Sequence, residues 1–244
     1  MVRKLRKFAV AFGIGMLATT AGAADGGRIF LVDGAALVER GGESYRAARG
    51  GLLQQGDILR TANASRVQWW MEDESIYTIG PSSRLQITEF QINRNATDQS
   101  QGLGRLTLRL LKGGFRSLTG FIGSRNRSAY QVNTPTATMG IRGTDYTIFY
   151  LTGEDAVAAN TEPGTYVQVT AGSVVLGNQS GQITVGPGQV AFAPDNGGAP
   201  RLIAKMPATL ALAIEGPLFE WDQEFLRELN LDIRIEPEEP TSPS

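Results

Sequence analysis

The feature that most restricts the fold of this 244-residue chain is a succession of short apolar segments, each closed by a turn that contains glycine. The succession runs from Arg28 to about Pro194. In "GRLTLRLLKGG", Leu106, Leu108 and Leu110 alternate with residues that belong to the opposite face, a period of two that is typical of a β-strand. Many short strands separated by glycine turns predict an all-β domain, either a sandwich or a roll.

The N-terminus has a different character. A basic start is followed by the uncharged apolar run Phe8–Thr20 and by Ala21–Ala23, small residues typical of a signal-peptidase site. The run is shorter than the about 20 residues that span a bilayer. We therefore expect export with cleavage after Ala23, an uncleaved membrane anchor being the alternative, and no transmembrane segment after cleavage. No cysteine follows the run, which excludes a lipid-anchored lipoprotein.

After Pro207 the alternation ends and helical spacing begins. Leu218, Trp221, Phe225 and Leu229 recur at steps of three and four residues, which predicts one amphipathic helix whose first turn holds a proline. We expect its apolar stripe to pack on the β-domain; the alternative is an amphipathic docking element. The expected organisation is a signal peptide (1–23), a β-domain (28–195), a helical segment (205–232) and a disordered, proline- and acid-rich tail (233–244). Within the β-domain, 93–104 and 151–163 are expected to be loops.

The residue inventory narrows the chemistry. The chain has no cysteine and no histidine, so it has no disulfide, no thiol nucleophile, no Ser-His-Asp triad and no Cys or His zinc site. Its mildly acidic balance gives no electrostatic basis for binding nucleic acid. A glycan hydrolase would need two carboxylates about 5 to 9.5 Å apart, and no such pair is evident. Acid clusters at 72–74 and 238–239 could hold calcium, but we expect a solvated turn and the disordered tail. We predict no catalysis, cofactor or metal.

The stretch "TPTATMGIRGT" combines turn residues with the start of a strand. Pro135 favours an extended Thr134, and Gly140 and Gly143 can adopt positive φ or allow a close backbone approach. We expect Arg142 to donate hydrogen bonds to carbonyls or to a carboxylate where the strand begins. The alternative is that Arg142 contacts an anionic ligand or a partner chain.

The strand that follows should be buried on both faces. Tyr146, Ile148 and Tyr150 share one face, whereas Phe149 and Leu151 place apolar bulk on the other.

Three further residues have two interpretations each. Trp69 and Trp70 are adjacent in a strand and therefore point to opposite faces. We expect one to lie in the core and the other to offer a platform for a sugar or a partner protein. Asp57, directly after Gly56, is expected to bond the backbone of its own turn rather than to act as an acid catalyst.

Four segments, in order, resemble the signature of the FecR family domain. They are "LLQQGDILRT", "LTLRLLKGGFR", "TPTATMGIRGTDYTIFY" and "VQVTAGSVVLGN", and the resemblance extends over about residues 28–193. The motif positions, structural or partner-binding, are Gly56, Asp57, Thr61, Gly114, Arg116, Thr134, Pro135, Arg142, Gly143, Thr144, Tyr146 and Gly172. One departure is Glu74, where the family typically has glycine, so that turn should differ in type.

The resemblance implies an exported β-domain that acts through protein–protein contact. In the regulators that name the family, a sigma-factor-binding segment and a transmembrane helix precede this domain, whereas here we expect only a signal peptide. We therefore carry over no sigma-factor binding.

The expected function is that of a non-enzymatic binding or signalling module in the periplasm, at the cell surface or secreted. The expected partner is another envelope protein, such as an outer-membrane receptor or a component of a surface system. The alternative is a structural or carbohydrate-binding envelope component that uses Trp69, Trp70 or Trp221.

Overall fold

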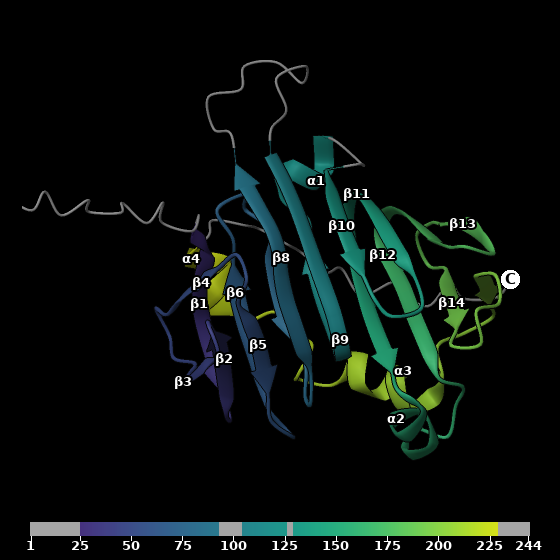
Figure 1. Cartoon of the computed structure of the whole chain (residues 1–244), viewed down its shortest axis with the longest axis horizontal. Helices are drawn as coiled ribbons and strands as arrows, with labels where there is room; N and C mark the ends of the chain where they lie inside the picture. Colours follow the sequence, from purple (N-terminus) through teal and green to yellow (C-terminus); the bar gives the residue numbers. More distant parts are fainter. Residues whose placement is uncertain (1–24, 93–103, 126–128, 229–244) are drawn as a thin grey trace, which may run out of the picture.

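The computed structural model describes residues 25–92, 104–125 and 129–228, and these form an all-β fold with short helices (Figure 1). The expected signal peptide, all but the last residue of the loop expected over 93–104, and the expected tail lie outside the described residues. The strands are β1 (Asp25–Asp33), β2 (Ala36–Arg40), β3 (Glu43–Arg46), β4 (Leu52–Gln54), β5 (Ile58–Thr61), β6 (Arg66–Trp70), β7 (Ile76–Ile79), β8 (Arg84–Ile92), β9 (Gly104–Leu118), β10 (Tyr130–Asn133), β11 (Thr138–Leu151), β12 (Gly164–Asn178), β13 (Gly181–Val185), β14 (Val190–Pro194) and β15 (Arg201–Ile203). The helices are α1 (Phe121–Arg125), α2 (Gly153–Ala158), α3 (Ala208–Glu215) and α4 (Gln223–Glu228).

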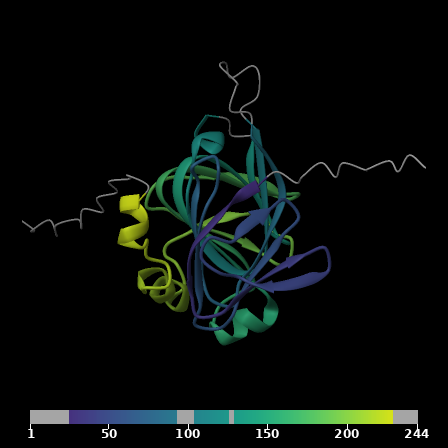
Figure 2. The same ribbon diagram turned by 90° about the vertical axis from the view of Figure 1, so that its left-hand side faces the viewer.

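All the strands belong to one sheet that curls around a core (Figures 1 and 2). The curl depends on long strands that change neighbours along their length. The first part of β9 lies between β8 and β10, and its last part lies between β7 and β11. Strand β12 likewise pairs with β11 throughout, but with β14 in its first part and β13 in its last. The predicted all-β class, with its sandwich or roll, is confirmed.

Three tyrosines mark the centre of the core. The Tyr130 hydroxyl lies 2.9 Å from that of Tyr77 and 2.8 Å from that of Tyr146, and all three side chains are fully buried. Burial raises the pKa of each phenol well above its ordinary value. The three hydroxyls therefore stay neutral and satisfy one another, as buried polar groups require.

A second apolar cluster covers the other face of β11. Phe149 and Leu151 pack there with Leu210 of α3 and with Phe219, while Tyr146 on the same strand belongs to the main core. Both faces of the strand are thus buried, as its composition predicts.

Two expectations about the helical parts are wrong. The segment 151–163, expected to be a loop, contains α2, which begins with a capping box formed by Thr152 and Asp155. The C-terminal helix does not begin at Pro217: α4 starts at Gln223, and Trp221 lies before it. The chain stays non-helical there because Phe219 and Trp221 both turn inward and are buried. None of the helices among the described residues has the length and apolar character to cross a membrane.

Candidate functional site

The "TPTA" part of the motif forms the turn between β10 and β11. The Thr134 hydroxyl oxygen accepts hydrogen bonds from the backbone N–H groups of Thr136 (3.3 Å) and Ala137 (3.0 Å). It also lies 2.7 Å from the Thr165 hydroxyl on β12, so it ties the turn to the neighbouring strand. Pro135 is exposed at the tip of this turn.

The "RGT" part forms a bulge where β11 and β12 come unusually close. The register of the two strands shifts between Arg142 and Asp145. Gly143 has φ of 53° and Gly172, opposite it, has φ of 78°, values that L-residues with side chains rarely adopt. A Cβ added to Gly172 would lie 2.0 Å from the Gly143 carbonyl oxygen. The two motif glycines therefore allow the backbones to touch.

A buried ion pair secures the strand just after this bulge. Arg116 of β9 donates to both carboxylate oxygens of Asp145, from Nε at 3.0 Å and from Nη2 at 2.6 Å. The two side chains are only 13% and 11% exposed. The ring of Trp221 lies 5.0 Å from the guanidinium carbon and covers the pair.

The stabilising contact expected of Arg142 is therefore made by Arg116 instead. Arg142 is exposed, and it makes no hydrogen bond or ion pair with any residue that the structure describes. The reason is its register position: β11 alternates, and Arg142 lies on the outer face of the sheet with Thr138 and Gly140.

A second motif group joins β5, β8 and β9. The Thr61 hydroxyl donates to the Gly80 carbonyl (2.6 Å) and accepts from the Ser83 N–H (2.9 Å). The Ser83 hydroxyl in turn accepts from the N–H of Gly114 (2.9 Å). A Cβ on Gly114 would lie 2.3 Å from the Phe149 ring, so this position requires glycine.

Asp57 accepts a hydrogen bond within its own turn, as expected, and also forms an ion pair with Arg40. Its Oδ2 accepts from the Gln54 N–H at 2.7 Å, after Gly56 with φ of 95°. Both carboxylate oxygens also accept from Arg40 of β2, each at 2.7 Å. The sequence did not reveal this partner, because a fork-to-fork pair across a sheet leaves no local signal.

The acidic turn at 72–74 is not the solvated turn that its composition suggested. Asp73 is fully buried, and its carboxylate accepts from the Ser75 N–H (3.0 Å) and from the Ser75 hydroxyl (2.8 Å). Glu74 has φ of 67°, so this turn keeps the left-handed conformation that glycine would adopt. Burial raises the pKa of Asp73, although the hydrogen bonds from Ser75 oppose the shift.

This raised pKa gives a testable pH dependence. A carboxyl group with a raised folded-state pKa contributes its full stability below its unfolded-state pKa and loses it as the pH rises through the folded pKa. We expect Asp73→Asn to remove that loss, so the variant gains stability over the wild type between about pH 4 and about pH 7. Each unit of pKa difference is worth about 1.4 kcal/mol. Urea unfolding at both pH values measures the gain.

The control for this prediction is Glu215→Gln, which removes a carboxylate at an exposed position on α3, away from this turn. Parallel stability–pH curves for the wild type and Asp73→Asn would show that the carboxyl group is not the cause.

The two adjacent tryptophans lie as expected, one inside and one outside. Trp69 is fully buried and stacks on Tyr77, with 4.8 Å between the ring centroids. Trp70 is 38% exposed, and its neighbour across the sheet is Arg28 of β1, which in turn pairs with the exposed Leu52 of β4. These three residues, here called the Trp70 surface, border a cavity of about 350 Å³.

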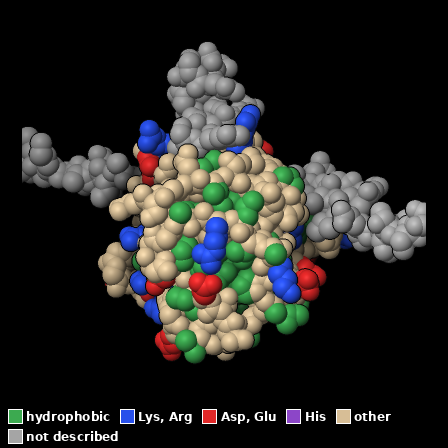
Figure 3. Space-filling view, turned by 90° about the vertical axis from the view of Figure 1, so that its right-hand side faces the viewer, with side chains coloured by type: hydrophobic (Ala, Val, Ile, Leu, Met, Phe, Trp, Pro, Cys, Tyr) green, Lys and Arg blue, Asp and Glu red, His purple; other side chains and the backbone are tan. Residues whose placement is uncertain are grey.

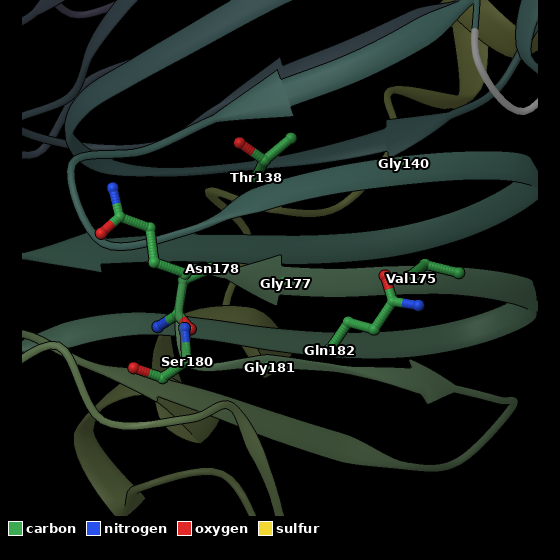
Figure 4. A pocket seen from close by; sticks show the side chains of 9 residues that line it. Thr138, Gly140, Val175, Gly177, Asn178, Ser180, Gly181 and Gln182 are labelled. Carbon is green, nitrogen blue, oxygen red and sulfur yellow. The ribbon is translucent and has the colours of Figure 1, made fainter.

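A different hollow lies on the outer face of β11, β12 and β13 (Figure 4). It has a volume of about 750 Å³ and contains no charged side chain. Thr138 reaches it from β11, and Asn178, Ser180 and Gln182 reach it from the hairpin between β12 and β13. The adjoining end of the molecule also shows mainly uncharged atoms with few charged side chains (Figure 3).

Taken together, most of the motif residues described above join neighbouring strands of the fold. Asp57, Thr61, Gly114, Thr144 and Tyr146 are buried, whereas Gly56, Pro135, Arg142, Gly143 and Gly172 are exposed. No group of three metal-ligating side chains occurs among residues 25–92, 104–125 and 129–228. Two surfaces available for binding are the Trp70 surface and the uncharged hollow.

Comparison with known proteins identifies the family of this domain. The model of the family described as FecR protein matches residues 57–175, which include all the motif residues except Gly56. Two crystal structures of a "putative anti-sigma factor" from Parabacteroides distasonis share 10% identity with this chain, with TM-scores of 0.46 and 0.45. Each comparison covers 65% of this chain and 65% or 64% of the other. No curated protein matches the sequence. The segment from Asp57 to Val175 is a FecR-family domain, and the chain is a FecR-domain protein.

Proposed function

We propose that this chain is exported and that its FecR domain acts in the periplasm or at the cell surface as a non-catalytic signalling module. The FecR match over residues 57–175 supports this role, because the family resemblance implies a domain that acts through protein–protein contact. The basic and apolar start of the sequence, followed by small residues, supports export. The domain would then receive or pass a signal by contact with another envelope protein.

The state of the carboxylates supports binding rather than catalysis. Asp57 and Asp145 are held by arginines, Asp155 by Lys112 at 2.9 Å, and Asp73 by Ser75. Glycosidic chemistry needs two carboxylates that face each other across a cleft. These four are instead committed to structural contacts.

The Trp70 surface is the observation that supports a protein partner. Tryptophan and arginine are enriched at the energetically dominant positions of protein interfaces. Here Trp70 and Leu52 flank Arg28 on three neighbouring strands, and the two apolar side chains are 38% and 39% exposed. A partner that covered this row would remove a large aromatic side chain from water.

Trp70→Ala should therefore abolish capture of the partner while leaving the fold intact. The full chain is immobilised and exposed to envelope extract from its own organism, and bound proteins are identified by mass spectrometry. We expect the wild type to retain one protein. The variant should retain at least tenfold less of it, equivalent to a loss of about 1.4 kcal/mol or more in binding free energy. Thermal unfolding checks that the variant is folded.

The control is Leu212→Ala, which truncates an apolar side chain that is 70% exposed on α3, away from the Trp70 surface. It should retain the partner. Equal capture by Trp70→Ala, or turnover of an envelope polymer by the purified protein, would contradict the proposal.

A further inference from the structure

The outer face of strands β9 to β13 carries a continuous row of polar side chains. Arg109 pairs with Asn133, Asn133 with Thr138, Thr138 with Gly177, and Gly177 with Gln182, so one row crosses five strands. On β9 to β12 the neighbours Leu108, Val132, Met139 and Leu176 are buried, and on β13 Gln182 is exposed beside the half-buried Ile183, which places the row on the outside. We call this row, together with Arg105 and Arg142, the polar face (front of Figure 1).

The polar face is cationic, although the whole chain has a net charge of −1. Arg105, Arg109 and Arg142 are exposed, and none of them has a hydrogen bond or ion pair with a residue of the described ranges. The other cations of these strands are different, since Lys112 pairs with Asp155 and Arg116 with Asp145. Three uncompensated arginines on one face attract an anionic ligand.

The carboxylates near the polar face offset only part of this charge, since Glu89 is one acid beside three arginines. Within β8 to β13, the acidic residues are Glu89 and Asp145. Asp145 is committed to Arg116, and Glu89 lies beside Thr107 on β9, 3.4 Å from its hydroxyl. The hollow beyond Thr138 holds no acid, and Asp195 lies only in the smaller hollow next to it, which has a volume of about 340 Å³.

The uncharged part of the polar face narrows the class of ligand. Its side chains are amides and hydroxyls, which donate and accept hydrogen bonds. Gly177, which has no side chain, also lines the hollow. The large hydrophobic side chains that the described residues expose all lie elsewhere, at Leu37, Tyr45, Leu52, Trp70, Val157, Leu202 and Leu212. A protein partner would be expected to find aromatic or aliphatic anchors, whereas a polyhydroxylated ligand needs none.

We propose that the polar face binds an acidic polysaccharide, with carboxylate groups at the arginines and sugar hydroxyls along the amide and hydroxyl row. Guanidinium groups bind carboxylates through paired, charge-assisted hydrogen bonds. The row repeats at the strand spacing of about 4.8 Å, which is close to the advance of one sugar unit along an extended chain. Five neighbouring strands thus place four polar side chains and one glycine at the spacing of successive sugar units. This inference concerns a different surface from the one proposed for the protein partner.

The test is calorimetric titration of the full chain with hexasaccharides of alginate and of pectate, which are polyuronates, and with neutral cellohexaose. We expect at least one polyuronate to bind, and cellohexaose to bind at least tenfold more weakly. Arg109→Gln should weaken polyuronate binding about tenfold, as expected for one charge-assisted hydrogen bond. Thr138→Val should weaken it severalfold, because it removes a hydroxyl of the row at similar volume.

The control variant is Arg201→Gln, which makes the same charge change on β15, where Arg201 lies 3.4 Å from Glu162. It should bind as the wild type does, and so should Trp70→Ala, which separates this proposal from the protein-binding one. The proposal is overturned if neither polyuronate binds, or if Arg109→Gln and Arg201→Gln behave alike. It is also overturned if polyglutamate of equal charge binds as well and Thr138→Val has no effect, since charge alone would then explain the binding.

Discussion

Replacing Arg116 with alanine should lower the free energy of unfolding by about 3 kcal/mol or more. The variant leaves the carboxylate of Asp145 in a site where the side chain is only 11% exposed, with no cation in contact. It also removes the guanidinium group that lies against the Trp221 ring. An uncompensated buried charge costs more than the pair itself contributes. Urea unfolding at neutral pH, followed by far-UV circular dichroism, measures the loss.

Arg142→Ala is the matched control. It removes the other arginine of the family motif, which is exposed, whereas the Arg116 side chain is only 13% exposed. Because Arg142 is exposed and has no partner among the described residues, its loss should change the free energy of unfolding by less than about 0.5 kcal/mol. The double variant Arg116→Ala/Asp145→Ala should be less destabilised than the sum of its single variants. Equal destabilisation by Arg116→Ala and Arg142→Ala would contradict this division of roles.

Gly172→Ala should be nearly as damaging, for a reason that involves no charge. The φ of 78° is a left-handed conformation, which costs a residue with a Cβ about 1–2 kcal/mol. In addition, the new Cβ would lie 2.0 Å from the Gly143 carbonyl oxygen and 2.8 Å from the Thr144 side chain. Overpacking of this kind costs about 1–3 kcal/mol more. We expect a total loss of about 2–5 kcal/mol, measured by chemical unfolding.

Gly188→Ala measures the backbone part of that loss alone, so the difference between the two variants gives the packing part. Gly188 has nearly the same φ, 74°, but a Cβ there would meet no atom within 4 Å. It should cost only the about 1–2 kcal/mol of the backbone conformation. If both variants lost the same amount, the close approach of β11 and β12 at the bulge would not be what requires glycine at position 172.

These two predictions place the structural role of the motif in the joint between β9, β11 and β12. Arg116, Asp145 and the glycine pair fix where β11 may bend, and the bend sends its last part under α3 and Phe219. Arg142 and Pro135 remain outside this joint and are exposed. A binding role for the motif therefore rests on Arg142 and Pro135, while the residues of the joint determine stability.

The sequence by itself determined the fold class and the local geometry. Alternation with a period of two predicts the strands, and the glycines predict where they end. Trp69 and Trp70 are adjacent and therefore lie on opposite faces, because backbone geometry within a strand is local. The resemblance to FecR proteins came from the order of four short segments. The capping box of Thr152 and Asp155 is a local signal for a helix start that the sequence analysis missed.

The tertiary structure alone decided which polar residues are buried and with whom. The composition of the 72–74 turn predicts a solvated Asp73, but in the folded chain Asp73 is buried. The motif predicts that Arg142 is the stabilising arginine, but Arg116, remote in sequence, makes the contact with Asp145. The C-terminal helix begins at Gln223 and not at Pro217, because Phe219 packs against Gly80. A Cβ on Gly80 would lie 2.2 Å from the Phe219 ring. Such pairings depend on strand register and on long-range packing, which no stretch of sequence specifies locally.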